Sequence, residues 1–235
     1  MTQPSSGRFA LYWAPPTADP LWRFGTRWLG RDPETATGSP PGDGAPADPA
    51  WLAAATAEPR HYGLHATLKP PFRLAEGRTR EALVEALAAF AARTAPVAGP
   101  ALALRRLGRF LALVPSGPAP AIAALAAQLV EQFDGFRAPP GDAELAKRRA
   151  HGLTPAQEAN LARWGYPYVM GEFRFHVTLS GALAPEALDR LEALLQPLVA
   201  PFTTAPLAIA AFALFEQADP AQPFRLTQRF PVGLA

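Results

Sequence analysis

The sequence predicts an α+β fold in which two lobes face each other. Segments with the alternation of strands lie among segments with the spacing of amphipathic helices, an order that favours antiparallel pairing. Two short segments, 63–69 and 174–180, carry the same pattern of residues, and each is followed by a predicted helix and then a strand or hairpin. The similarity between the two halves is too weak for a repeat protein, and it predicts two facing lobes.

The N-terminal half alternates predicted strands and helices. Segment 21–29 has its apolar residues at helical spacing, and segment 79–93 is rich in alanine and leucine. A stretch rich in Pro, Gly, Ala and Asp at about 30–50 predicts a loop. In chain order we expect a strand over 9–14, a helix over 21–29, a short helix over 51–56, a strand over 61–68 that stops at Pro70 and Pro71, a helix over 79–93 and a hairpin over 102–114 turning near Gly108.

The C-terminal half continues the same mixture. Segment 141–163 is expected to be helical in pieces, with Thr154 as a cap and Pro155 as the first helical residue. The remaining predicted elements are helices over 119–133 and 185–199 and strands over 173–179, 207–215 and 224–232.

Composition excludes several classes of protein. The 235 residues contain no cysteine, so there is no disulfide, thiolate metal site or cysteine nucleophile. No apolar run reaches the ~18 residues of a membrane span, and the polar start lacks a signal-peptide pattern, so we expect a cytoplasmic protein with no membrane partner. The net charge of +2 argues against a duplex DNA partner.

The two echoed segments hold the residues that suit catalysis. The first reads Gly-Leu-His-Ala-Thr-Leu-Lys and the second reads Arg-Phe-His-Val-Thr-Leu-Ser. Side chains alternate across a strand, so each segment is expected to have one apolar face and one polar face. The expected polar faces are Gly63, His65, Thr67 and Lys69 in the first segment and Arg174, His176, Thr178 and Ser180 in the second.

Paired histidines and threonines suit chemistry at a phosphate. An imidazole with its ordinary pKa of ~6.5 can give or take a proton near neutral pH. In-line displacement at phosphorus needs a base on one side and an acid on the other, and His65 and His176 are the expected pair. Thr67 and Thr178 are expected to donate hydrogen bonds to phosphate oxygens. The residues leave open which histidine is the base.

The motifs also carry a family resemblance. The two His-x-Thr-Leu motifs resemble the paired signatures of the 2H phosphoesterase superfamily. The longer strings at 60–72 and 164–181 are similar to one branch, the DUF1045 proteins associated with phosphonate metabolism, as are the strings at 8–15 and 28–32. The resemblance therefore covers most of the chain.

The resemblance implies a single bilobal, pseudo-symmetric catalytic domain over 1–235, with antiparallel sheets facing a central groove and helices outside. It implies a metal-independent hydrolase, a cyclic phosphodiesterase of the 2H type, that needs no cofactor. The implied substrate is a small phosphorylated molecule, a ribose cyclic phosphate or a nucleotide. His65 and His176 carry over as the proton-transfer pair, and Thr67 and Thr178 as the residues that hold the phosphate.

Three further residues are candidates for substrate binding. Arg174 and Lys69 share the expected catalytic faces and suit a phosphate, although solvation at a strand end explains them as well. Tyr168 suits stacking on a base or sugar, although loop packing is its commoner role.

Two other functions stay open. The same site could hold a phosphorylated metabolite or an RNA end without turnover. A zinc hydrolase is the third reading, because His61 lies four residues before His65, a spacing that binds zinc on a helix. Gly63 and Pro70 favour a strand here, and no carboxylates complete a ligand set, so no metal is expected.

Overall fold

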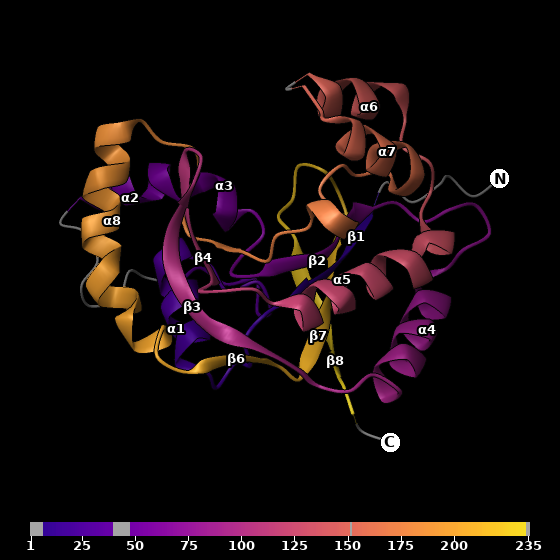
Figure 1. The fold of residues 1–235 in the computed structure, drawn as a ribbon, viewed down its shortest axis with the longest axis horizontal. Coiled ribbons are helices and arrows are strands. Elements are labelled where there is room, and N and C mark those ends of the chain that lie inside the picture. Colours follow the sequence, from indigo (N-terminus) through magenta and orange to yellow (C-terminus); the bar gives the residue numbers. More distant parts are fainter. Residues whose placement is uncertain (1–6, 40–47, 151, 234–235) are drawn as a thin grey trace.

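The computed structural model describes residues 7–39, 48–150 and 152–233. Its centre is an eight-stranded sheet in which every pair of neighbouring strands is antiparallel, in the order β6-β3-β4-β5-β2-β1-β7-β8 (Figure 1). The strands are β1 (Arg8–Trp13), β2 (Ala66–Phe72), β3 (Val97–Leu107), β4 (Phe110–Pro115), β5 (Val177–Thr178), β6 (Pro206–Ile209), β7 (Ala211–Gln217) and β8 (Arg225–Pro231). The α+β class and the antiparallel pairing are confirmed.

The two halves of the sheet meet at the two histidine motifs. Strands β2 and β5, which begin one residue after His65 and His176, are neighbours at the middle of the sheet, where Ala66 pairs with Val177. Four strands lie on each side of this contact, counting β5 with one half and β2 with the other. The two expected sheets are thus the halves of one continuous sheet.

Helices cover the sheet and form the outer parts of both lobes (Figure 1). Helix α5 packs on β2 and β3, α4 packs on β8, and α8 packs on β3 and β4. Most helices start as their sequences predict; Thr154, for example, forms a capping box with Gln157 ahead of Pro155. The helices are α1 (Pro20–Leu29), α2 (Pro49–Ala55), α3 (Ala57–Arg60), α4 (Arg80–Ala92), α5 (Pro120–Gln132), α6 (Asp142–Arg149), α7 (Pro155–Trp164) and α8 (Pro185–Val199), with 3₁₀ turns at Asp134–Phe136, Met170–Glu172 and Ala200–Phe202.

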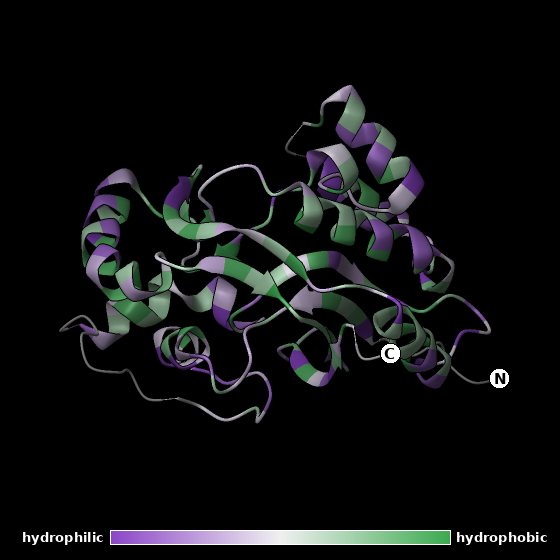
Figure 2. Ribbon diagram, turned by 60° about the horizontal axis from the view of Figure 1, so that its bottom comes forward, coloured by the Kyte–Doolittle hydropathy of each residue, from purple (hydrophilic) through white to green (hydrophobic). Residues whose placement is uncertain are grey.

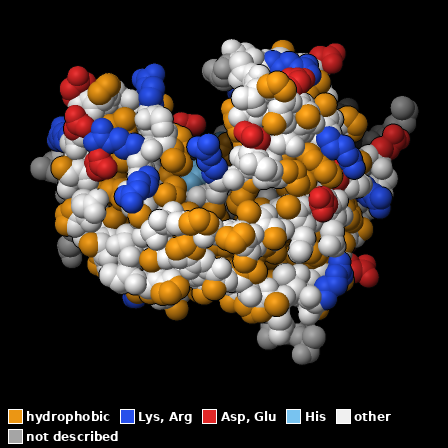
Figure 3. All heavy atoms as spheres, viewed as in Figure 1, with side chains coloured by type: hydrophobic (Ala, Val, Ile, Leu, Met, Phe, Trp, Pro, Cys, Tyr) orange, Lys and Arg blue, Asp and Glu red, His pale blue; other side chains and the backbone are white. Residues whose placement is uncertain are grey.

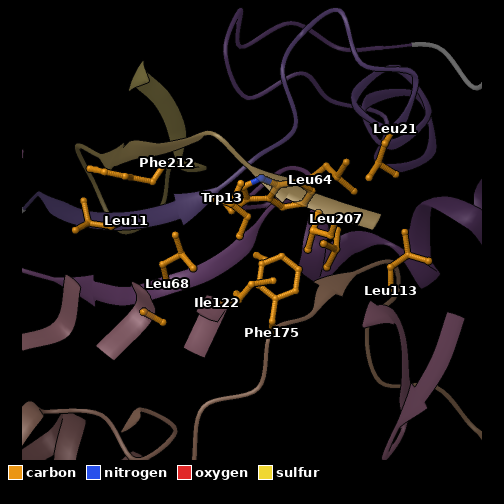
Figure 4. Close-up of a cluster of buried hydrophobic side chains, with 14 of the residues drawn as sticks. Leu11, Trp13, Leu21, Leu64, Leu68, Leu113, Ile122, Phe175, Leu207 and Phe212 are labelled. Atoms are coloured by element: carbon orange, nitrogen blue, oxygen red, sulfur yellow. The ribbon is translucent and has the colours of Figure 1, made fainter. Parts of the chain in front are cut away.

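The main core lies between the sheet and these helices. Figure 2 shows the hydrophobic character of the strands and the hydrophilic outer sides of the helices. In Figure 4, Trp13 and Phe175 lie close together at the centre of the core, and their ring centroids are 5.5 Å apart. Because Trp13 comes from β1 and Phe175 from the second motif segment, this contact ties the two halves together.

The first motif strand begins and ends later than predicted. Strand β2 starts at Ala66 rather than at residue 61, and it continues through Pro70 and Pro71. The prolines lie at an irregularity in the pairing with β1, where Phe9 pairs with Phe72 and Leu11 pairs with Lys69. The two prolines of β2 oppose the single residue Ala10 of β1 there, and such bulges accept proline because they leave a backbone amide unpaired.

Two other predicted strands also differ. Segment 173–179 forms a strand only at Val177–Thr178, because residues 173–176, which follow the 3₁₀ turn Met170–Glu172, have no regular structure. The predicted strand over 207–215 is two strands, β6 and β7, which separate after Ile209 and pair with β3 and β1.

Part of the predicted loop at 30–50 is described. Arg31 and Gly38 form an isolated bridge, and α2 begins at Pro49, while residues 40–47 lie outside the described residues. Within the described ranges, no helix has both the length and the apolar character of a membrane span.

Candidate active site

The structure brings both motifs to one cavity. His65 and Thr67 from the β2 segment and His176 and Thr178 from the β5 segment line a cavity of about 280 Å³. Figure 3 shows histidine atoms on the floor of the hollow between the two lobes, with basic side chains beside them. We call this cavity the two-histidine pocket.

Both histidines are oriented in the same way. Nδ1 of His65 lies 2.9 Å from the carbonyl oxygen of Gly63, and Nδ1 of His176 lies 2.7 Å from that of Arg174. A carbonyl only accepts, so in each case Nδ1 carries the proton and donates it. In the neutral imidazole this leaves Nε2 as the unprotonated nitrogen. The two motifs therefore offer matching proton acceptors.

Gly63 supplies the turn that orients His65. Its φ is +79°, in the left-handed region, and a Cβ built there would lie 2.6 Å from Cγ of Pro33. Only glycine therefore fits between the end of α3 and the motif without strain.

His65 lies against aromatic rings. Its ring stacks on Tyr12 with centroids 4.1 Å apart, and the ring of Tyr62 lies 5.5 Å away. Burial disfavours the imidazolium and lowers the pKa of His65 to about 4; the nearby His176 adds to this, and the hydrogen bond to Gly63 opposes it. His65 is therefore neutral at pH 7 and able to accept a proton.

The threonines are held by the sheet. Thr67 pairs with Tyr12 of β1, and Thr178 pairs with Ala112 of β4. Burial raises the pKa of the Tyr12 hydroxyl, and the neighbouring Thr67 side chain opposes that rise. Both threonine side chains are partly exposed to the pocket and remain available to a ligand.

Lys69 does not share the face of His65 and Thr67, so that expectation is wrong. Tyr12 pairs with Thr67 while the next residue back, Leu11, pairs with Lys69, so β2 holds one extra residue between them. The extra residue turns Lys69 to the opposite face. There Nζ donates to the carbonyl of Val130 on α5 at 3.2 Å, and burial lowers the pKa of Lys69 to about 8.

Arg174 and Tyr168 also lie outside the lining of the two-histidine pocket. The residues before Val177 are not in a strand, so alternation does not hold, and Arg174 lines a separate groove with Phe173 and Phe175. Arg174 contributes its carbonyl oxygen, which accepts the hydrogen bond from Nδ1 of His176, and not its side chain. Tyr168 is 47% exposed and lines an adjoining cavity.

Two arginines of the pocket were not among the predicted site residues. Arg8 at the start of β1 and Arg148 on α6 both line it, as do the rings of Tyr62 and Tyr166. Alternation along β1 puts Arg8 on the same face as Tyr12, which is the signal that could have marked Arg8. Arg148 sits on a helix distant in sequence, and only the tertiary structure brings it here.

His61 has a structural partner. Its Nε2 accepts a hydrogen bond from Nε2 of the buried Gln217 at 2.9 Å. In the part of the chain that the structure describes, no three His, Cys, Asp or Glu side chains gather as metal ligands.

Comparison with known proteins gives a family match and two curated relatives. The model described as "Protein of unknown function (DUF1045)" matches residues 67–225, which is more than half of the chain. A ribose 1,5-bisphosphate phosphokinase PhnN from Janthinobacterium sp. (strain Marseille) is 41% identical over 233 residues, 97% of this chain and 51% of its own length. The protein of the same name from Laribacter hongkongensis (strain HLHK9) is 41% identical over 179 residues, 75% of this chain and 40% of its own length. The chain thus spans about half the length of these relatives or less.

Solved structures with a similar fold have low identity. The chain is 15% identical to E. coli LigT complexed with 3′-AMP, with a TM-score of 0.44 and coverage of 97% of this chain and 98% of LigT. It is 14% identical to a phosphoesterase, with a TM-score of 0.46 and coverage of 96% and 98%.

These relatives overturn the predicted reaction. The sequence motifs led us to expect a phosphodiester hydrolase, but the two relatives at 41% identity are named as phosphokinases, which transfer a phosphoryl group. The expected DUF1045 resemblance is confirmed by the family match.

Proposed function

This chain belongs to the DUF1045 family, and we propose that it binds a phosphorylated ribose in the two-histidine pocket and takes part in phosphoryl transfer on that ligand. The ligand class and the reaction class come from the name of the curated relatives. The observation that carries the proposal is that two imidazoles and two hydroxyls from symmetric motifs line one cavity.

The pocket offers a phosphate both donors and positive charge. The hydroxyls of Thr67 and Thr178 can each donate to a phosphate oxygen, and a hydrogen bond to a charged group contributes about 1.5–3 kcal/mol. Arg8 and Arg148 line the same pocket and match the charge of the ligand, while Glu58, which also lines it, is the acidic side chain that they outnumber. A sugar without a phosphate has no negative charge for the arginines and no phosphate oxygen for the threonine hydroxyls.

The histidines supply the proton transfers. The donor in this proposal is a nucleoside triphosphate and the acceptor is the sugar phosphate. His65 is neutral at pH 7, so its Nε2 accepts the proton that the acceptor oxygen of the sugar phosphate loses as it bonds to the terminal phosphorus of the donor. His176, when it carries a proton on Nε2, donates to the bridging oxygen that leaves with the nucleoside diphosphate. The two imidazoles lie one residue before neighbouring central strands and line the same pocket, which supports their acting on one phosphorus atom.

Calorimetry tests the binding part of this proposal. We expect ribose 5-phosphate and ribose 1,5-bisphosphate to bind the purified chain and ribose not to bind. Thr67→Val and Thr178→Val should each weaken phosphate binding about tenfold, the loss of one charge-assisted hydrogen bond. Thr203→Val, which removes an exposed hydroxyl bonded to Ala200, is the matched control. Equal affinity for ribose, or binding unchanged in both pocket variants, would refute the proposed site.

Phosphorus NMR tests the reaction. With ribose 1,5-bisphosphate, ATP and Mg²⁺, we expect a phosphoryl group to move to the sugar phosphate. His65→Ala or His176→Ala should slow this transfer by roughly 10²–10⁴, the usual contribution of a positioned acid or base. Release of inorganic phosphate in its place, or no reaction in a chain that binds both ligands, would refute the role in transfer.

A further inference from the structure

A second cavity adjoins the two-histidine pocket. Its volume is about 660 Å³, and it shares Arg8, Tyr62, Pro71 and Arg148 with the pocket. Figure 1 shows α6 and α7 standing over the sheet on this side of the molecule, and residues of α6 form one wall of the cavity. The shared lining means that one ligand can extend from the pocket into this cavity.

The lining of the second cavity is strongly basic, and we call it the cationic cavity. Among the described residues that line it, Glu144 is the one acidic residue and five are basic: Arg8, Arg73, Arg137, Lys147 and Arg148.

Only two of these five cations are neutralised. Arg137 pairs with Asp134 at 2.8 Å, and Arg148 pairs with Glu144 at 3.7 Å. The other three have no carboxylate partner among the residues that the structure describes. Basic side chains gathered around a hollow without counter-charges attract an anionic ligand.

Arg8 is held in place at the junction between the two cavities. Its Nε donates to Oε1 of Gln217 at 2.6 Å, and its guanidinium lies 5.3 Å from the ring centre of Phe224. Gln217 is itself fixed, because its Nε2 is directed at the carbonyl oxygen of Gln222, 2.6 Å away, and at His61. No described residue accepts a hydrogen bond from the Nη atoms of Arg8, so both remain for a bidentate contact with a phosphate.

Arg148 of α6 lines both cavities as well. Its guanidinium lies 4.4 Å from the ring centre of Tyr166, which also lines the two-histidine pocket. The stacking orders the long side chain before a ligand arrives, and this lowers the entropy lost on binding. Two ordered arginines from distant elements thus meet where the cavities join.

We infer that the cationic cavity is a binding site for a second phosphate, so that the chain selects a small sugar carrying two phosphates over one carrying a single phosphate. One phosphate lies between the histidine and threonine pairs, and the other lies in the cationic cavity beyond Arg8 and Arg148. This inference rests on the proposed function for the first phosphate, while the second site stands on its own lining.

The test compares three probes on the wild-type chain and two double variants. The probes are ribose 5-phosphate, ribose 1,5-bisphosphate and inorganic pyrophosphate, titrated by calorimetry at low salt. Arg73→Gln/Lys147→Gln removes two exposed cations that line only the cationic cavity. Arg23→Gln/Arg27→Gln removes the same net charge from the exposed side of α1, outside the lining of both cavities, as the control.

We expect the wild-type chain to bind the bisphosphate at least tenfold more tightly than the monophosphate. The Arg73→Gln/Lys147→Gln variant should lose on the order of tenfold in affinity for the bisphosphate and for pyrophosphate, with monophosphate binding within about twofold of wild type. The control variant should keep the preference for two phosphates.

The outcomes separate the two proposals. Monophosphate binding with no preference for the bisphosphate would overturn the second site and leave the proposed function standing. An equal loss for all three probes, or the same loss in the control variant, would also overturn it. If neither ribose phosphate binds, the proposed function fails; pyrophosphate binding that depends on Arg73 and Lys147 would still support an anion site in the cationic cavity.

Discussion

Replacing Gly63 by alanine tests how the first motif is positioned. Gly63 has φ +79° and its carbonyl accepts the hydrogen bond that orients His65. Alanine there carries two separate costs. The left-handed conformation costs about 1–2 kcal/mol for a residue with a Cβ. The overlap with Pro33, whose Cγ would lie 2.6 Å from the new Cβ, costs about 1–3 kcal/mol more.

These costs predict a measurable loss of stability. Together they give roughly 2–5 kcal/mol, and at ~2–4 °C per kcal/mol for a chain of this size, Tm should fall by about 4–20 °C. Gly77→Ala is the matched control, because Gly77 has φ +74° and an added Cβ would meet no atom within 4 Å. The control therefore includes the conformational cost alone.

Calorimetric unfolding of both variants separates the two costs. Gly63→Ala should unfold several degrees below Gly77→Ala, and the difference measures the contact with Pro33. In the same variant, displacement of the Gly63 carbonyl should shift the His65 ring resonances in an NMR spectrum. Equal Tm values for the two variants would show that the chain next to His65 has room to move and that the turn is not what orients the imidazole.

Further perturbations probe the buried groups. NMR titration should show His65 gaining its second ring proton near pH 4. Because this pKa lies below the ordinary 6.5, the wild type should lose stability relative to His65→Gln as pH falls from 6.5 to 4. A midpoint near 6.5 would contradict the argument that burial lowers the pKa of His65. The pKa of Lys69 is about 8, below its ordinary 10.5. In urea unfolding, the free energy of unfolding of the wild type should therefore rise by ~3 kcal/mol relative to Lys69→Met as pH rises from 8 to 10.5. A difference in stability between the two proteins that stays constant across that range would show that Lys69 is not desolvated. Trp28→Phe removes the buried hydrogen bond from Nε1 to the Leu179 carbonyl and should lower the free energy of unfolding in urea by ~1–3 kcal/mol. This loss should exceed that of Trp51→Phe, because the ring of Trp51 lies beneath the exposed Arg190. Equal losses would show that the hydrogen bond contributes nothing.

The pairing of the two motifs could be predicted from the sequence, because a repeated polar pattern on two amphipathic segments has few explanations other than a shared site. His65, Thr67, His176 and Thr178 do line one pocket. The reaction could not be predicted in the same way. Side chains that suit a phosphate serve transfer as well as hydrolysis, and the phosphokinase relatives corrected that expectation.

Helices were located well because their signals are local. The caps of α4 and α7, at Thr79 and Thr154, and the left-handed glycines that end α1 and α7, at Gly30 and Gly165, each act within one or two turns. Such determinants are readable in a short window of sequence whatever the rest of the chain does.

The tertiary structure alone decided which cations reach the pocket. A single extra residue in β2 turned Lys69 away, because side chains alternate with a period of two and one inserted residue exchanges the faces. Arg8 of β1 and Arg148 of α6 line the pocket, where Lys69 and Arg174 were the expected basic residues. Strand register and the docking of a distant helix depend on pairings between residues far apart in the chain, and a local pattern of residues does not contain them.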